Sequence, residues 1–182
     1  VAMAQLDFKR LVAYSSVSHM GFVLLGLSSV TPEGMNGALL QMFNHGIITG
    51  GMFLLVGVLY DRAHTRQLDA FGGLGATLPV YAGVLTFFSL ASLGLPGLSG
   101  FVSEFLSLVG AFGVHRIVTA ISVLGIVVTA AYMLTVLQRV LLGPLNERWQ
   151  RLPDMTGREL LTLVPLLLIV LLVGLYPLSV LH

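Results

Sequence analysis

Five long apolar stretches, joined by short polar connections, occupy most of this chain. They cover residues 9–29, 33–60, 79–112, 115–142 and 158–176. Of the 182 residues, 56% are hydrophobic and only 9% are charged, whereas a soluble domain carries about 25% charged residues. A helix of about 20 apolar residues crosses a bilayer with every backbone hydrogen bond satisfied internally. The sequence therefore predicts an all-α integral membrane protein with about five crossings, folded as a single transmembrane domain over residues 1–182.

The third stretch is interrupted by the sequence GLPGLSG at residues 94–100. Pro96 removes a backbone donor, and the glycines permit the tight backbone geometry of a helix break. The part after the break, about 14 residues or roughly 21 Å long, is short for a complete crossing. We therefore expect one discontinuous crossing, with Ser99 as the cap of its second half.

The distribution of basic residues favours the same topology. One broken crossing places eight of the nine lysine and arginine residues on one side of the membrane, and only Arg116 on the other. The eight are Lys9, Arg10, Arg62, Arg66, Arg139, Arg148, Arg151 and Arg158. Two separate crossings would divide them almost evenly. Because basic loops stay in the cytoplasm, we expect this side to be cytoplasmic and His182 to lie outside.

Three ionisable side chains fall near the middle of apolar stretches: His19, His45 and Glu104. The helix rise places His19 about 15 Å inward from Lys9, and His45 roughly 22 Å from Tyr60. Glu104 follows the break directly. Burying such groups in a membrane costs several kcal/mol, so they usually mark a path for protons or ions.

Polar residues accompany these three positions at helical spacing. Ser15 lies one turn before His19, while Gln41, Asn44 and Thr49 share a face with His45. Thr86, Ser89 and Ser92 form a weaker polar row in the first half of the broken stretch, and Thr129 and Tyr132 form another. Hydroxyl and amide groups on one face can hold a file of waters, and histidine exchanges protons near neutral pH. We therefore predict that His19, His45 and Glu104 relay protons.

Other readings of the same residues stay open. The three side chains could serve only as hydrogen-bonding scaffold between helices. His19 and His45 could ligate a b-type haem, or join Glu104 around a non-haem iron. The chain has no cysteine, which excludes disulfides, thiolate metal sites and iron–sulfur ligation. It also lacks a nucleotide-binding fingerprint, and we expect no cofactor or metal in this chain and no nucleic-acid partner.

Residues 7–21, DFKRLVAYSSVSHMG, resemble the proton-pumping membrane subunits of respiratory complex I, NADH:quinone oxidoreductase. The same family includes the multisubunit sodium/proton antiporters. Two further motifs are typical of its subunit M branch, called chain 4 in mitochondria. They are HTR at residues 64–66 followed by GGL at 72–74, and GLPGLSGFVSEF at residues 94–105. Sister subunits usually carry lysine where Glu104 stands.

The resemblance implies the last five of fourteen transmembrane helices, with residues 1–6 as the end of the preceding helix. It implies that the broken helix belongs to the second of two inverted half-channels. The family's relay positions map onto His19, His45 and Glu104, and Glu104 matches the carboxylate that exchanges protons towards the outer face.

The resemblance also implies a role without a redox centre. The chain would supply a proton path, and other subunits would bind NADH and quinone. Its partners would be neighbouring antiporter-like subunits, buried water and the lipid of a bacterial plasma membrane or an equivalent energy-transducing membrane. The alternatives are a subunit of a sodium/proton antiporter and, from a different class, a haem-binding membrane electron carrier.

Overall fold

The computed structural model describes residues 1–179 and is built from helices. The long ones are α1 (Phe8–Ser29), α2 (Pro32–Ala63), α6 (Arg116–Leu141) and α7 (Gly157–Leu175), and the shorter ones are α4 (Pro79–Ser92) and α5 (Ser99–Phe112). One-turn helices are α3 (Leu74–Thr77) and 3-10 turns at Ala2–Ala4, Leu68–Ala70, Glu147–Trp149 and Pro177–Ser179. No strand occurs among these residues, which confirms the predicted all-α class.

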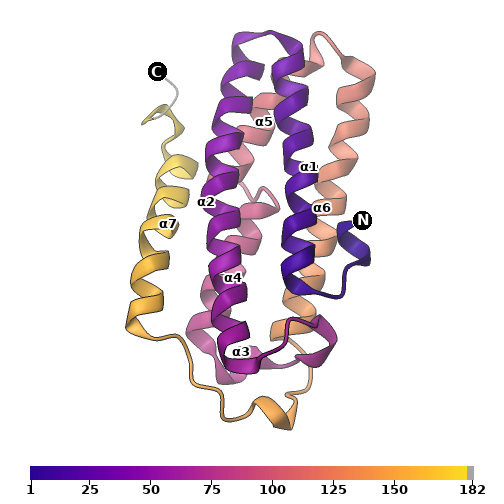
Figure 1. The fold of residues 1–182 in the computed structure, drawn as a ribbon. Coiled ribbons are helices and arrows are strands. Elements are labelled where there is room, and N and C mark those ends of the chain that lie inside the picture. The colour runs from indigo at the N-terminus through magenta and orange to yellow at the C-terminus, as the bar shows by residue number, and fades with distance from the viewer. Residues whose placement is uncertain (180–182) are drawn as a thin grey trace.

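The helices run up and down in one bundle (Figure 1). The four long helices are each long and apolar enough to cross a membrane, and most side chains of α6 and α7 are not buried inside the bundle. The short helices α4 and α5 follow one another, with α4 in the lower half of the view and α5 in the upper half. The predicted boundaries of the apolar stretches agree with these helices within a few residues. That α4 and α5 together make one crossing stays a prediction.

Polar caps fix the helix ends. The carboxylate of Asp7 accepts from the backbone N–H of Arg10 at the start of α1, and the Thr31 hydroxyl accepts from Gly34 at the start of α2. Thr156 and Glu159 form a reciprocal capping box at the start of α7. Each cap satisfies backbone donors that the helix leaves open. Because only two residues join α1 to α2, these helices must lie antiparallel.

Glycines let α5 approach α2 backbone to backbone. A methyl group on Gly37 would collide with the backbone of Ser107, and one on Gly110 would collide with the backbone of Gly34. Small residues at a helix interface permit this close approach in membranes. The helix α2 packs most extensively against α5 and α1, so these three helices set the spacing around the residues predicted to be functional.

The break between α4 and α5 corrects one prediction. Leu93–Leu98 are not helical, and Gly94 and Gly97 adopt positive φ angles of 77° and 95°. The cap of α5 is Leu98, whose backbone is extended, and no side chain accepts a hydrogen bond there. The prediction that Ser99 caps α5 is wrong because the helix begins one residue earlier than such a cap requires. Ser99 lies inside the first turn, where its buried hydroxyl has no partner among residues 1–179.

The two chain ends carry the remaining topological predictions. Residues 2–4 form one 3-10 turn and Gln5 is extended. That residues 1–6 end a preceding helix stays a prediction. His182, which we expected on the outer side, lies outside the described residues.

Candidate functional site

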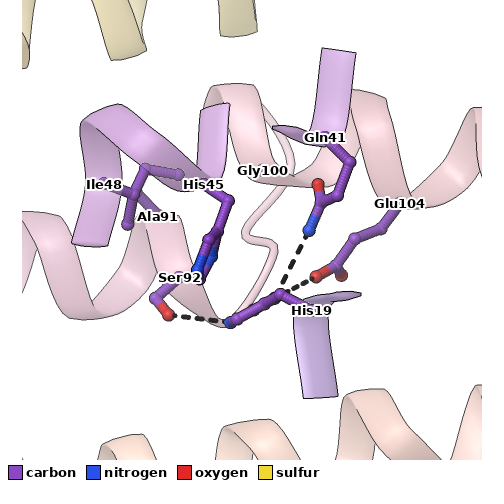
Figure 2. Close-up of a pocket in the computed structure, with 8 residues that line it drawn as sticks. All are labelled: His19, Gln41, His45, Ile48, Ala91, Ser92, Gly100 and Glu104. Carbon is purple, nitrogen blue, oxygen red and sulfur yellow. Dashed lines mark hydrogen bonds and ion pairs between the residues drawn. The ribbon is translucent and has the colours of Figure 1, made fainter. Parts of the chain in front are cut away.

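The three predicted residues come together in one small cavity beside the helix break (Figure 2). His19 comes from α1, His45 from α2 and Glu104 from α5, although 85 positions separate His19 from Glu104. The rest of the lining is Gln41, Ile48, Ala91, Ser92 and Gly100. We call His19, His45, Glu104, Gln41 and Ser92 the central cluster.

His19 contacts every other member of the central cluster. Its Nδ1 lies 3.1 Å from Oε1 of Glu104, and its Nε2 lies 3.3 Å from Oγ of Ser92. The amide nitrogen of Gln41 lies 3.4 Å from the same Nδ1. His19 and Glu104 are only 3% and 4% exposed. Both ring nitrogens therefore have polar partners, and these come from three different helices.

His45 lies beside His19 without a direct hydrogen bond to it. The ring centroids are 5.1 Å apart and the planes are tilted by 41°. Among residues 1–179, His45 bonds to Thr49 on its own helix, whose Oγ1 lies 3.1 Å from Nδ1. The centre of a water molecule can occupy about 10 Å³ of the cavity. The cavity therefore has room for one water. Transfer of a proton between the two rings therefore requires a bridging water or a rotation of one ring.

The glycines of the break bring Glu104 to its place. A methyl group on Gly94 would lie 2.9 Å from Oε2 of Glu104, and one on Gly100 would collide with the carbonyl of Ala91. Larger residues at these positions would separate the carboxyl group from the break and α4 from α5. The break therefore positions Glu104 and Ser92 around the same histidine.

A second row of polar groups supports Gln41 from behind. The Ser103 hydroxyl donates to Oε1 of Gln41. Asn44 Nδ2 donates to Oγ of Ser103 at 3.1 Å and to the carbonyl of Ser99 at 2.8 Å. Sequence reasoning grouped Gln41 and Asn44 with His45, but they turn towards His19 and α5. It missed Ser103, for which the signal was a serine at every fourth position of α5, namely Ser99, Ser103 and Ser107.

Ser15, one turn before His19 in the sequence, is not part of the central cluster. The Ser15 hydroxyl donates to the carbonyl of Val12 in its own helix, at 2.7 Å. Ser15 thus uses its proton locally, as serines in helices often do. Ser92, from the weaker polar row, contacts His19 instead.

The His19–Glu104 pair can hold one proton in two ways. Either the protonated carboxyl donates to a bare Nδ1, or a protonated Nδ1 donates to the carboxylate. The atoms are 3.1 Å apart, so a proton can move between them without a change in the backbone. Each group also offsets part of the free-energy cost of burying the other. An isolated charge in a membrane has no partner to offset that cost.

The geometry does not fit a haem or a mononuclear iron. With the two rings 5.1 Å apart and space for one water, no porphyrin can lie between His19 and His45. Among the described residues, no group of three or more histidine, cysteine, aspartate or glutamate side chains is placed to hold a metal ion. The arrangement is suited to moving a proton.

Residues 1–130 match the sequence profile of the NADH:quinone oxidoreductase/Mrp antiporter transmembrane family. The chain belongs to this family. NADH-quinone oxidoreductase subunit M of Rhodobacter capsulatus is 48% identical over 178 residues, which cover 97% of this chain and 35% of that protein. The chain thus spans about a third of the length of the curated relatives it matches.

Two solved structures share the fold of this family member. One is respiratory complex I from Thermus thermophilus with bound NADH, with a TM-score of 0.94 and 38% identity, covering 98% of this chain and 38% of that one. The other is the Mrp complex of a Dietzia species, with a TM-score of 0.88 and 20% identity, covering 99% of this chain and 42% of that one. At this identity the Mrp match shows the fold alone.

Proposed function

We propose that this chain forms part of a proton-translocating subunit of NADH:quinone oxidoreductase, corresponding to subunit M. Protons pass through His45, His19 and Glu104, while other subunits bind NADH and quinone and carry out the redox reaction. The observation that carries this proposal is the buried contact between His19 and Glu104, because two groups that exchange a proton meet there in a membrane. The 48% identity to a subunit M supports it.

The proposal includes an orientation and partners. The basic residues of the loops gather at the end of the bundle where α1 begins and α2 ends, the lower end of Figure 1. We assign that end to the cytoplasm and treat α4 and α5 as one broken crossing. Neighbouring membrane subunits and lipid then cover the apolar outer sides of α6 and α7.

A sodium/proton antiporter subunit is the second candidate, because the family profile spans both kinds of protein. Proton pumping by the assembled complex in sodium-free vesicles separates the two. Sodium dependence would favour the antiporter.

The deciding experiment replaces Glu104 with Gln in the full-length subunit of the assembled complex. The amide keeps the shape of the carboxyl group but cannot carry a proton. We expect proton pumping and coupled quinone reduction to fall by roughly 100-fold, as for the loss of a positioned proton-transfer group. Pumping is followed with a pH-sensitive dye in vesicles.

Glu33→Gln is the matched control, because Glu33 is an exposed residue at the start of α2. It should leave pumping unchanged. Full pumping by a Glu104→Gln complex would overturn the proposed function.

A further inference from the structure

Gln41 and Glu104 approach the same atom, Nδ1 of His19. The Gln41 amide nitrogen lies 3.4 Å from it and Oε1 of Glu104 lies 3.1 Å from it. A ring nitrogen carries either a lone pair or an N–H. A bare Nδ1 accepts the amide N–H of Gln41, whereas a protonated Nδ1 donates to the Glu104 carboxylate and repels that amide. The contact with Gln41 therefore favours the bare nitrogen.

The orientation of the Gln41 amide is fixed by its neighbours. The Ser103 hydroxyl donates to Oε1 of Gln41, which leaves the amide N–H groups directed at His19. Asn44 donates in turn to Ser103, at 3.1 Å. All three side chains are buried, so water does not compete for these bonds. Gln41 thus presents a donor, and not an acceptor, to the imidazole.

We propose that Gln41 is a positioning residue that stabilises the proton-free state of the His19–Glu104 pair, an inference that rests on the proposed function. The N–H bond of His19 breaks as the O–H bond of Glu104 forms, and Glu104 then gives this proton to a water. The bare Nδ1 would then face a carboxylate oxygen with no hydrogen between them. The Gln41 N–H donates to the bare nitrogen instead, and so favours release of the proton.

The other titratable groups around His19 are the same in every variant that tests this scheme. Among the described residues, α2 contributes His45, α5 contributes Glu104, and α6 contributes Tyr132, which lies within electrostatic reach of Glu104. The polar contact from α4 is the Ser92 hydroxyl, which lies 3.3 Å from Nε2 of His19. A change limited to Gln41 or Ser103 alters none of these charges, so a shift in pH dependence reports on the amide donor.

The test is the pH profile of proton pumping by the assembled complex in vesicles. Gln41→Met keeps the length of the side chain but removes the donor, so the pair holds its proton more tightly. We expect the whole profile to move to higher pH by about one unit, the effect of losing one hydrogen bond. Ser103→Ala leaves Gln41 free to rotate and should give a smaller shift in the same direction.

Ser107→Ala is the matched control. Ser107 lies one turn after Ser103, is equally buried, and has a hydroxyl without a hydrogen-bond partner among residues 1–179. Its profile should not move. If Gln41→Met prevents assembly, Ser103→Ala decides the question.

An unchanged profile, or a shift to lower pH, would overturn the role of Gln41. If the Glu104→Gln complex does not pump in the same preparation, the proposed function stands without this role of Gln41. Pumping by the Glu104→Gln complex would instead remove the proposed function itself.

Discussion

The central cluster and the network around Arg62 are both polar, but they are built in opposite ways. All five N–H groups of Arg62 are donated: to Glu159 twice, both at 2.7 Å, and to the carbonyls of Val58, Pro153 and Asp154 at 2.9 to 3.1 Å. In the central cluster, the contacts of His19 measure 3.1 to 3.4 Å, and two of them share one nitrogen. One network is saturated and the other is not.

The difference suits the Arg62 network to holding the structure and the central cluster to the proposed movement of a proton. A guanidinium with every donor occupied has one favourable arrangement, so the Arg62 network fixes α2 to α7. Asp154 extends it to the start of α4, where its carboxylate accepts from the backbone N–H groups of Val80 and Tyr81. The central cluster instead leaves a choice of bonds, because Glu104 and Gln41 compete for the same nitrogen of His19. A proton can therefore be redistributed there while the helices stay in place.

Removing Arg62 gives the largest stability effect that this comparison predicts. Arg62→Leu leaves Glu159 without its charged partner, and the two side chains are only 10% and 25% exposed. We expect the free energy of unfolding to fall by about 3 kcal/mol. Unfolding of the full-length subunit by SDS in detergent micelles measures it.

Arg139→Leu is the control for Arg62→Leu. It breaks the pair between Arg139 and Asp69, whose side chains are 41% and 63% exposed, and should cost less than about 1 kcal/mol. An equal loss in the free energy of unfolding for the two variants would show that the Arg62 network stabilises the fold no more than the Arg139–Asp69 pair does.

A methyl group at Gly100 should disturb the central cluster through the break. Gly100→Ala places the methyl against the carbonyl of Ala91, so α4 and α5 must separate. We expect a loss of about 1–3 kcal/mol in the free energy of unfolding, together with reduced pumping. SDS unfolding and vesicle assays measure the two effects.

Gly46→Ala is the comparison for Gly100→Ala. Its methyl would meet nothing within 4 Å, although the residue adjoins His45. That variant should be neutral, or more stable by up to about 1 kcal/mol. If Gly46→Ala were destabilised as well, the loss at Gly100 could not be assigned to the helix break.

The smallest effect is expected at Thr49. Thr49→Val keeps the shape of the side chain and removes the hydroxyl that lies 3.1 Å from Nδ1 of His45. Losing one hydrogen bond corresponds to about 1 kcal/mol, so pumping should change by roughly fivefold or less. Thr135→Val, which removes a hydroxyl bonded within α6, is the control for the same vesicle assay. A loss of pumping as large as that of Glu104→Gln would show that the proposed path depends on His45 more than on His19.

The sequence by itself determined the helices, the break and the three central residues. Hydropathy follows from each helix's own contact with lipid, so the boundaries of α1, α2, α6 and α7 could be predicted within a few residues. The cost of burying an ionisable group in an apolar helix singled out His19, His45 and Glu104 before any contact was known.

Only the tertiary structure decided which atoms meet. Gln41 contacts His19 and not His45, Ser103 orients Gln41, and Ser99 does not cap its helix. These pairings depend on the rotation of each helix about its axis and on the distance between helices. Both are set where α5 contacts α2 through glycines more than 60 positions apart in sequence, at Gly37 and Gly110. No local pattern encodes such contacts, because each one is a property of two helices together.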